Sequence, residues 1–285
     1  MHLLHRKLVW TAIGQRLSGR FIVLAGIFSS IALATACTTP GERFARIAGQ
    51  QGLATVEFEV SRHTLTAHYA AGDHRASDRL HVYLSGDGTP WAGGRYPALD
   101  PSPRRSLILE LMALDPAARL LLNRPCYGHG RMPPQCHPAL WTSARYSEEV
   151  VAAMDEALDQ ARVAFASEHI VLIGYSGGGT LAWLLAQRRD DVVGVMTVAA
   201  NLDHRQWTAH HGYLPLTESL DPTELSPLRQ RIRQWHLVGG RDADVPEAVT
   251  RAVAGRVRRY PDFDHRCCWV AIWPEMLSEL ATELP

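Results

Sequence analysis

The feature that most constrains this chain is a glycine-rich turn between an apolar segment and a helical one. Residues 170–173 read Ile-Val-Leu-Ile, residues 174–179 read Gly-Tyr-Ser-Gly-Gly-Gly, and residues 179–187 have the composition of a helix. A short apolar strand that leads directly into a helix is typical of an α/β protein. Gly174 and Gly178 indicate a turn so tight that side chains there would clash, with Ser176 projecting from it.

Ser176 is therefore a candidate nucleophile. The N-terminus of the following helix carries partial positive charge, which favours negative charge that develops on a substrate. The alternative is a turn that only packs closely against its neighbours or that binds phosphate.

Short apolar strands alternate with helices through the rest of the chain. We expect strands at 55–61, 64–70, 80–84, 120–123, 170–173, 192–198 and 235–238, the first two antiparallel, and helices at 107–114, 148–166, 179–187, 246–257 and 275–284. The alternation predicts an α/β fold with a mainly parallel central sheet and helices on both faces. Residues 201–230 break the rhythm and predict a small cap-like excursion within a single domain at 55–285.

Residues 1–36 have the layout of a signal peptide. The first 20 residues contain four basic side chains and no acid, and residues 21–36 are sixteen uncharged residues that end in Ala-Thr-Ala. An uncleaved anchor is the alternative, although a membrane span needs about 20 apolar residues. Cleavage predicts an exported protein.

The residue after this segment, Cys37, sharpens the prediction of export. The run Leu-Ala-Thr-Ala-Cys at 33–37 resembles the lipobox of bacterial lipoproteins, with Ala34 where leucine is usual. The resemblance implies a lipidated Cys37 that tethers the protein to a membrane, and ordinary cleavage after Ala36 is the rival. Either route predicts a periplasmic or membrane-anchored protein, with residues 37–54 as a tether.

Four further cysteines follow in what would be an oxidising compartment. Cys126 and Cys136 lie ten residues apart in a segment rich in proline and glycine, and we predict a disulfide between them. Cys267 and Cys268 are adjacent, and adjacent cysteines are poorly placed to bridge. We expect this second pair to be reduced and buried.

Charge and lysine usage exclude several classes of function. The 29 basic and 29 acidic side chains balance, so nucleic acid is not an expected partner. The single lysine, Lys7, lies in the predicted signal peptide, so the exported chain could form no Schiff base. Metal-ligand spacings such as His-Glu-x-x-His are missing from the sequence, and we expect neither a metal nor a cofactor.

Together these motifs resemble the α/β-hydrolase superfamily over residues 55–284. The Gly-x-Ser-x-Gly turn between strand and helix matches its nucleophile elbow. The resemblance is closest to exported bacterial serine hydrolases with the segments Asn123-Arg124-Pro125-Cys126, Leu140-Trp141-Thr142 to Arg145-Tyr146-Ser147, and Asp264-His265-Arg266-Cys267-Cys268-Trp269.

The resemblance implies a catalytic triad in the chain order serine, acid, histidine. It assigns Ser176 as nucleophile and His265, in a loop before the last helix, as base. Asp242 matches the acid in a Gly-x-x-Asp-x-x-Val-Pro pattern, with Asp244 and Asp203 as alternatives.

The same resemblance implies an oxyanion hole from two backbone N–H groups, those of Gly177 and Asp87. Ser85 stands where many relatives have histidine. The negative charge of the Asp87 carboxylate would repel an oxyanion unless the side chain points away. The alternative is that residues 85–88 form a plain turn with no role in an oxyanion hole.

These assignments predict hydrolysis of a small-molecule carboxylic ester through an acyl-enzyme. The same groups could cleave a thioester or peptide. Two alternatives are an idle envelope or binding protein that keeps the fold, and an acyltransferase.

Overall fold

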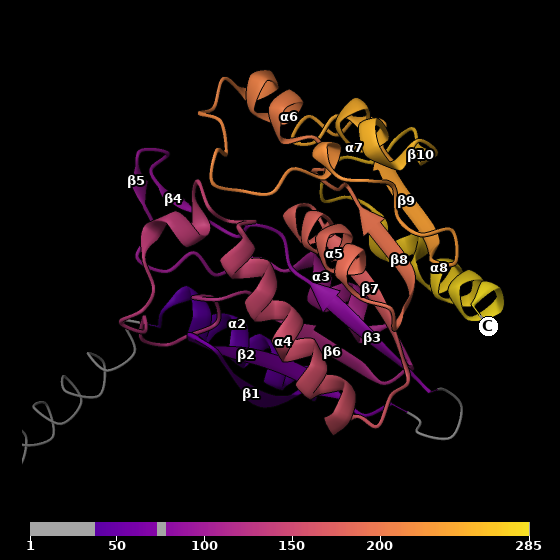
Figure 1. The fold of residues 1–285 in the computed structure, drawn as a ribbon, viewed down its shortest axis with the longest axis horizontal. Coiled ribbons are helices and arrows are strands. Elements are labelled where there is room, and N and C mark those ends of the chain that lie inside the picture. Colours follow the sequence, from indigo (N-terminus) through magenta and orange to yellow (C-terminus); the bar gives the residue numbers. More distant parts are fainter. Residues whose placement is uncertain (1–37, 73–77, 285) are drawn as a thin grey trace, which may run out of the picture. The chain divides into compact units, whose positions relative to one another are not determined.

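The computed structural model describes residues 38–72 and 78–284 and contains an eight-stranded sheet (Figure 1). The predicted signal peptide and Cys37 lie outside these residues. Across the sheet the strands run β1(Ala54–Val60), β2(His63–Ala70), β6(Arg119–Leu122), β3(Arg79–Leu84), β7(His169–Tyr175), β8(Val192–Val198), β9(Arg233–Gly239) and β10(Arg258–Tyr260). The β1–β2 and β2–β6 pairs are antiparallel and the other pairs are parallel. The predicted mainly parallel sheet is confirmed.

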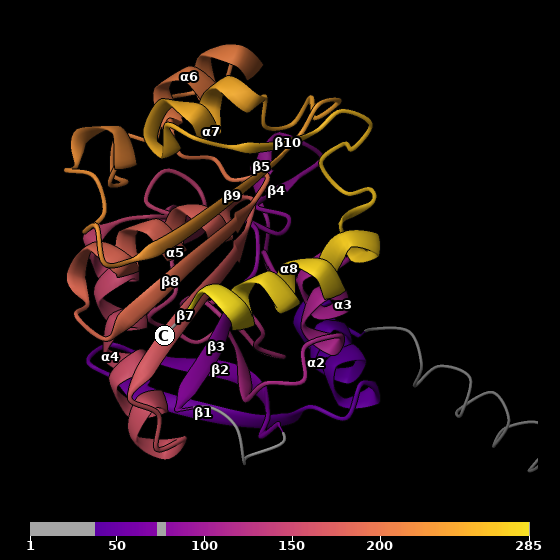
Figure 2. The ribbon, with the colours of Figure 1, turned by 90° about the vertical axis from the view of Figure 1, so that its right-hand side faces the viewer.

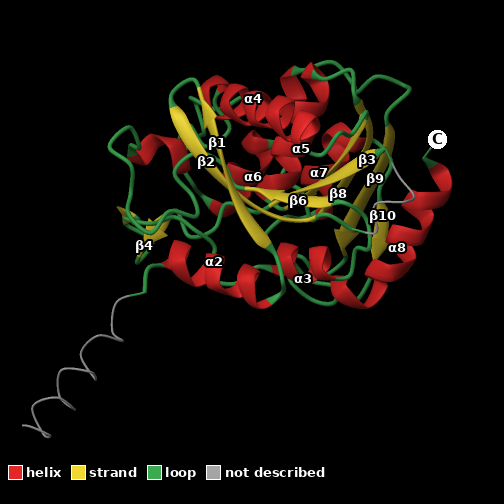
Figure 3. Cartoon of the chain, turned by 90° about the horizontal axis from the view of Figure 1, so that it is seen from below, coloured by secondary structure: helices red, strands yellow, loops and turns green. Residues whose placement is uncertain are grey.

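Helices cover both faces of the sheet (Figure 3). One layer contains α4(Glu148–Ala164) and α5(Gly177–Arg188), and the other contains α2(Pro40–Gln50), α3(Leu107–Ala113) and α8(Trp269–Glu283). Strand β3 shows how the layers are filled, because Leu80, Val82 and Leu84 pack toward the first layer and Tyr83 toward the second. This alternation follows from the two-residue period of a strand.

Helix α2 corrects the prediction of a tether over 37–54. Thr39 accepts a hydrogen bond from the Glu42 N–H, and the Glu42 side chain accepts one from the Thr39 N–H, which is a capping box. Phe44 and Ala48, one helical turn apart, are buried. A capped helix with an apolar face packs on the sheet and cannot act as a free tether.

The connections that follow the parallel strands form the end of the molecule where the predicted site residues lie. They include the small hairpin of β4(Trp91–Ala92) and β5(Tyr96–Pro97), the 3₁₀ helix at Pro138–Trp141, and α6(His204–His211) of the predicted excursion (Figures 1 and 2). Helix α7(Glu247–Ala254) lies beside α6. The last helix begins at Trp269, six residues before the predicted start, and continues through Pro274.

The described residues include no helix with the length and apolar character needed to cross a lipid bilayer.

Candidate active site

Ser176 occupies the sharp turn between β7 and α5. Its backbone has φ 53° and ψ −125°, a conformation that a residue with a side chain rarely adopts. A Cβ added to Gly174 would lie 2.2 Å from the Gly178 carbonyl oxygen, and one added to Gly178 would lie 2.1 Å from the Leu84 carbonyl oxygen. The two glycines are therefore required for the turn, as the sequence predicts. The Ser176 N–H donates to the Val198 carbonyl at 2.9 Å, which fixes the turn to β8.

The structure brings Ser176, His265 and Asp242 together. His265 Nε2 lies 3.1 Å from Ser176 Oγ, and His265 Nδ1 lies 2.8 Å from Asp242 Oδ2. The other oxygen, Asp242 Oδ1, accepts hydrogen bonds from the N–H groups of Asp244 and Val245 at 2.9 and 2.7 Å. This carboxylate is fully buried and is held at both oxygens, so it fixes the imidazole with Nε2 toward the serine.

A compact turn holds the histidine in place. The Asp264 carboxylate accepts hydrogen bonds from the N–H groups of Arg266 and Cys267, both at 2.7 Å. The Arg241 N–H donates to the Phe263 carbonyl at 2.8 Å, which ties the loop of the acid to the loop of the base. The His265 position is thus set by backbone contacts on both sides.

The two alternative acids have other partners. The Asp203 carboxylate accepts a hydrogen bond from the Gln206 N–H at 2.8 Å and caps α6. Asp244 lies next to the acid loop, where its carbonyl oxygen accepts hydrogen bonds from the side chains of Trp207 and His211. Asp242 is the acid that contacts His265.

Asp87 lies against the nucleophile turn. A Cβ added to Gly177 would be 2.0 Å from Asp87 Oδ1, so this carboxylate does not point away from the proposed oxyanion site. It pairs with Arg124 at 2.9 Å and Arg145 at 2.8 Å, and it accepts a hydrogen bond from the Tyr146 hydroxyl at 2.7 Å. Burial alone would raise the pKa of the Asp87 carboxyl, but the two guanidinium groups outweigh burial and hold the pKa well below its usual value.

The arginine cluster also anchors the loop that carries the Asp87 N–H. Arg124 Nη2 donates to the Ser85 carbonyl at 3.0 Å, and the Tyr127 hydroxyl donates to the Asp87 carbonyl at 2.9 Å. A Cβ added to Gly86 would lie 3.2 Å from Ser176 Cβ, so the anchored loop borders the nucleophile. The geometry thus puts both predicted N–H carriers, Gly177 and Asp87, next to Ser176.

No role could be predicted from the sequence for the side chains that surround Asp87. Cationic partners for Asp87 could have been expected, because an aspartate beside an oxyanion must be paired with cations if it is buried. Arg124 and Arg145 lay in segments that were singled out only by resemblance. No local pattern links Asp87 to residues 37 and 58 positions further along the chain.

Two buried polar side chains next to this cluster were also missed. His204 stacks on the Tyr146 ring, with centroids 4.7 Å apart, and burial lowers the pKa of His204 to about 4. Neither its ring nitrogens nor the side-chain atoms of Asn201 have a hydrogen-bond partner among the described residues. A neutral imidazole is therefore buried against Tyr146 at the start of α6.

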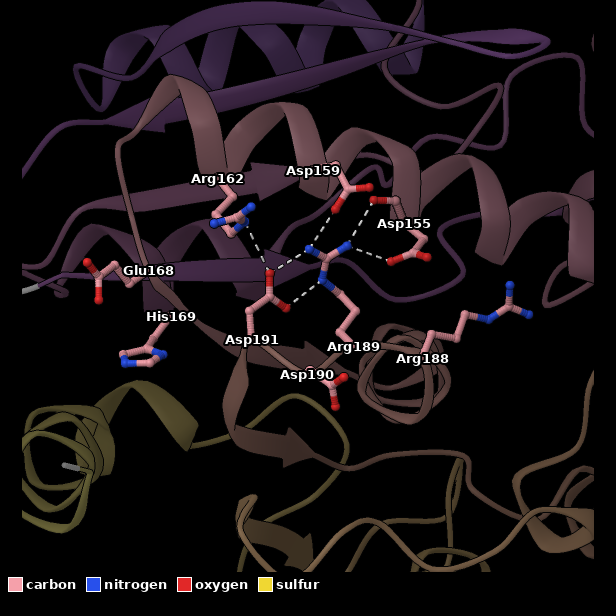
Figure 4. A pocket seen from close by; sticks show the side chains of 9 residues that line it. All are labelled: Asp155, Asp159, Arg162, Glu168, His169, Arg188, Arg189, Asp190 and Asp191. Atoms are coloured by element: carbon pink, nitrogen blue, oxygen red, sulfur yellow. Dashed lines mark hydrogen bonds and ion pairs between the residues drawn. The ribbon is translucent and has the colours of Figure 1, made fainter.

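A cleft of about 330 Å³ opens at His265. It is lined by Arg241, Ala243, Asp244, Asp264, His265, Arg266 and Cys267. A larger cleft, about 670 Å³, lies at the amino ends of β7 and β8, where Arg189 meets three carboxylates (Figure 4). The larger cleft is lined by charged residues at the strand ends opposite Ser176, whereas the smaller cleft includes His265.

The structure joins Cys126 to Cys136 through a disulfide with Cα atoms 5.7 Å apart. The expectation for the other pair is wrong. Cys267 and Cys268 are exposed and joined to each other in the open turn before α8, and the peptide bond between them is cis.

Comparison with known proteins identifies the fold. No protein-family model and no curated protein matches the sequence. Among solved structures, a proline iminopeptidase-related protein from Thermus thermophilus has a TM-score of 0.56 and 15% identity, covering 81% of this chain and 96% of that one. An esterase from Pyrococcus furiosus has a TM-score of 0.54 and 13% identity, covering 82% and 91%. Mouse alpha/beta hydrolase domain-containing protein 10 has a TM-score of 0.52 and 14% identity, covering 80% and 97%. The predicted α/β-hydrolase fold is confirmed.

Proposed function

We propose that the protein is a serine hydrolase that cleaves a carboxylic ester through an acyl-enzyme. The observation that carries the proposal is the hydrogen-bonded chain from Ser176 through His265 to Asp242, at 3.1 and 2.8 Å. A serine in a strained elbow, a histidine in contact with it and a buried acid behind the histidine form the constellation that acyl transfer requires.

In the proposed reaction, His265 Nε2 removes the proton from Ser176 Oγ while the oxygen attacks the acyl carbonyl. Asp242 stabilises the resulting imidazolium and holds its orientation. Collapse of the tetrahedral intermediate expels the alcohol, which takes the proton from His265. Water then repeats the sequence on the acyl-enzyme, releases the acid and restores Ser176.

The cluster around Asp87 is proposed to assist the oxyanion. Two guanidinium groups against one carboxylate leave net positive charge beside Gly177. This charge favours the negative oxygen of the tetrahedral intermediate, whereas an unpaired Asp87 would repel it. The N–H groups of Gly177 and Asp87 are the proposed direct donors.

An ester is the preferred substrate class because the Pyrococcus furiosus protein with a similar fold is an esterase. A shared fold supports such a choice by analogy only, and the site itself supplies the mechanism. We also propose that residues 1–36 direct export and that Cys37 carries a lipid that tethers the protein to a membrane.

Reaction of the full-length protein with a fluorophosphonate probe tests the proposed nucleophile. We expect the probe to label the wild type at Ser176 and not Ser176→Ala, and kcat/KM for p-nitrophenyl esters to fall by about 10⁴-fold or more in this variant. Labelling that persists in Ser176→Ala would contradict the assignment. A wild-type protein that neither reacts nor turns over any ester would favour an idle binding protein, and product analysis with added alcohol would reveal an acyltransferase.

Asp242→Asn tests the acid, with Asp203→Asn as its matched control. Loss of the buried carboxylate should misorient His265 and lower kcat/KM by about 10⁴-fold, whereas the control removes only a helix cap. An inactive Asp203→Asn protein beside an active Asp242→Asn protein would move the acid to the earlier strand.

A further inference from the structure

We propose that one corner of the active-site end docks on an anionic lipid bilayer. The docking surface consists of the β4–β5 hairpin with Leu99, the first turns of α2, and the neighbouring loops at 100–105 and 128–131. Its exposed side chains are Trp91, Tyr96 and Leu99, together with Arg43, Arg46, Arg95, Arg104, Arg105 and Arg131.

The apolar part of this surface is unusually open to water. Leu99 is 93% exposed, Tyr96 67% and Trp91 40%. All three belong to one short hairpin and the residues that follow it. Tyrosine and tryptophan favour the boundary between lipid head groups and acyl chains, and an exposed leucine beside them can insert below it.

The segment that follows the hairpin lies against the point where the N-terminal segment joins the domain. Asp100, next to Leu99, accepts a hydrogen bond from the Gly41 N–H in the first turn of α2 at 2.8 Å. A Cβ added to Gly41 would lie 2.6 Å from the His129 carbonyl oxygen, so the 128–131 loop meets the same corner.

The N-terminal segment would keep this corner close to a membrane. The apolar run at 21–36 ends three residues before Thr39, the N-cap of α2. Three extended residues reach about 10 Å. Whether a lipid on Cys37 or the apolar run itself sits in the bilayer, this short connection keeps the start of α2, which is part of the docking surface, near it.

Charge on the surface selects the kind of lipid. The docking surface contains six exposed arginines, and within residues 38–72 and 78–284 none of their guanidinium groups forms an ion pair. Two acids of this surface, Asp100 and Glu42, accept hydrogen bonds from backbone N–H groups, and neither pairs with an arginine among the described residues. Unpaired cations beside exposed apolar side chains complement an anionic bilayer surface.

Docking in this orientation would bring the proposed active site to the lipid. The hairpin begins directly after the 85–88 loop that borders Ser176, and the Thr89 N–H donates to the Pro101 carbonyl at 2.9 Å. The docking itself does not depend on catalysis, so it can be tested separately from the proposed hydrolase function.

The test is hydrogen–deuterium exchange of the full-length protein in lipid nanodiscs, followed by mass spectrometry. We expect amide exchange at 91–99 to be slower by about tenfold in phosphatidylglycerol-containing nanodiscs than in detergent micelles. Tyr96→Asp combined with Leu99→Asp should abolish this slowing, and Arg104→Glu with Arg105→Glu should reduce it. Val163→Asp is the matched control, because Val163 is 74% exposed at the end of α4, at the opposite end of the strands.

Three results would overturn the proposal. They are unchanged exchange at 91–99 in anionic nanodiscs, equal slowing in purely phosphatidylcholine nanodiscs, and slowing in micelles that increases with protein concentration. The last result would assign the surface to a second copy of the chain. Ser176→Ala should show the same slowing as the wild type, so loss of activity and loss of docking are distinguishable.

Discussion

Each end of the parallel strands carries an arginine–carboxylate cluster, and the two are built in opposite ways. At the carboxyl end, one carboxylate, Asp87, lies between the guanidinium groups of Arg124 and Arg145. At the amino end, one guanidinium, that of Arg189, is held by three carboxylates, those of Asp155, Asp159 and Asp191 (Figure 4). The first cluster is closed and the second opens onto the larger cleft.

Exposure explains why the two clusters serve different purposes. The arginines of both clusters are buried, but the carboxylates differ. The Asp87 side chain is 16% exposed, whereas those of Asp155 and Asp159 are 30% and 69% exposed. Buried charges depend on their partners because water cannot replace them, while exposed charges are solvated in either case. The closed cluster fixes the loop beside Ser176, and the open one ties α4 to the turn before β8.

Asp87→Asn should produce the largest effect on stability, because it leaves two buried guanidinium groups without their counter-ion. We expect a loss of about 3–5 kcal/mol in the free energy of unfolding, measured by urea denaturation. Arg189→Gln, the corresponding change at the centre of the other cluster, should cost about 1 kcal/mol because its carboxylates reach water. Equal losses in the two variants would remove the distinction between the clusters.

The pH dependence of stability should differ between the wild type and His204→Phe. Burial holds the pKa of His204 at about 4, below its unfolded value of about 6.5, so the unfolded chain binds the proton first as the pH falls. The contribution of the neutral His204 to the free energy of unfolding is fully present above pH 6.5. It is lost as the pH falls from about 6.5 to 4, and the loss is at most about 3 kcal/mol.

Phenylalanine keeps the stacking on Tyr146 and removes the titrating group. His204→Phe should therefore unfold with a shallower pH dependence over this window and change little at pH 7.5. Urea denaturation at a series of pH values measures it. The buried His68 and His236 have pKa values that burial lowers to about 4, so part of the slope should remain. A slope identical to that of the wild type would show that His204 does not titrate in this way.

Removing the Cys126–Cys136 disulfide should cost about 2–3 kcal/mol, the loop-closure entropy of about ten residues. The double variant Cys126→Ser with Cys136→Ser tests this by urea denaturation under non-reducing conditions. Cys267→Ser with Cys268→Ser is the control, because adjacent residues close almost no loop. A larger loss in the control would indicate that the turn at His265, rather than the 126–136 loop, depends on its disulfide.

Patterns local in sequence predicted the elements that carry the site. Strand β7 and its glycine turn were predictable because the motif is contiguous in sequence: a Cβ on Gly174 would meet the carbonyl of Gly178, four residues further along. The contact that excludes a side chain at Gly178, with the Leu84 carbonyl, comes from a distant segment. Short elements such as β4, β5 and β10 were missed, since two or three residues show no period. Helix α2 was overlooked although its capping box is visible in the sequence.

Contacts between distant segments could not be predicted in the same way. Asp242 and His265 were paired by resemblance, but the partners of Asp87 come from two other loops and depend on how those loops fold back over β3 and β6. Buried ion pairs have no sequence spacing of their own. The exposure of a turn is equally hard to predict from the sequence, because burial depends on which distant segments pack against it. The adjacent Cys267 and Cys268, which were expected to be buried, are exposed.

The smallest effect is expected for Asp159→Asn in the open cluster. Asp159 accepts a hydrogen bond from Arg189 Nη2 at 2.8 Å, but Arg189 keeps its bonds to Asp155 and Asp191 when this one is lost. An exposed pair of this kind contributes about 0.2–1 kcal/mol, so the free energy of unfolding should fall by no more than about 1 kcal/mol. Ester turnover should not change, because the cluster lies at the strand ends opposite Ser176. Added salt should shrink the difference from the wild type further, since exposed charges are screened. A loss above about 2 kcal/mol, or a fall in kcat/KM, would mean that the amino-end cluster acts as one unit that the rest of the fold depends on.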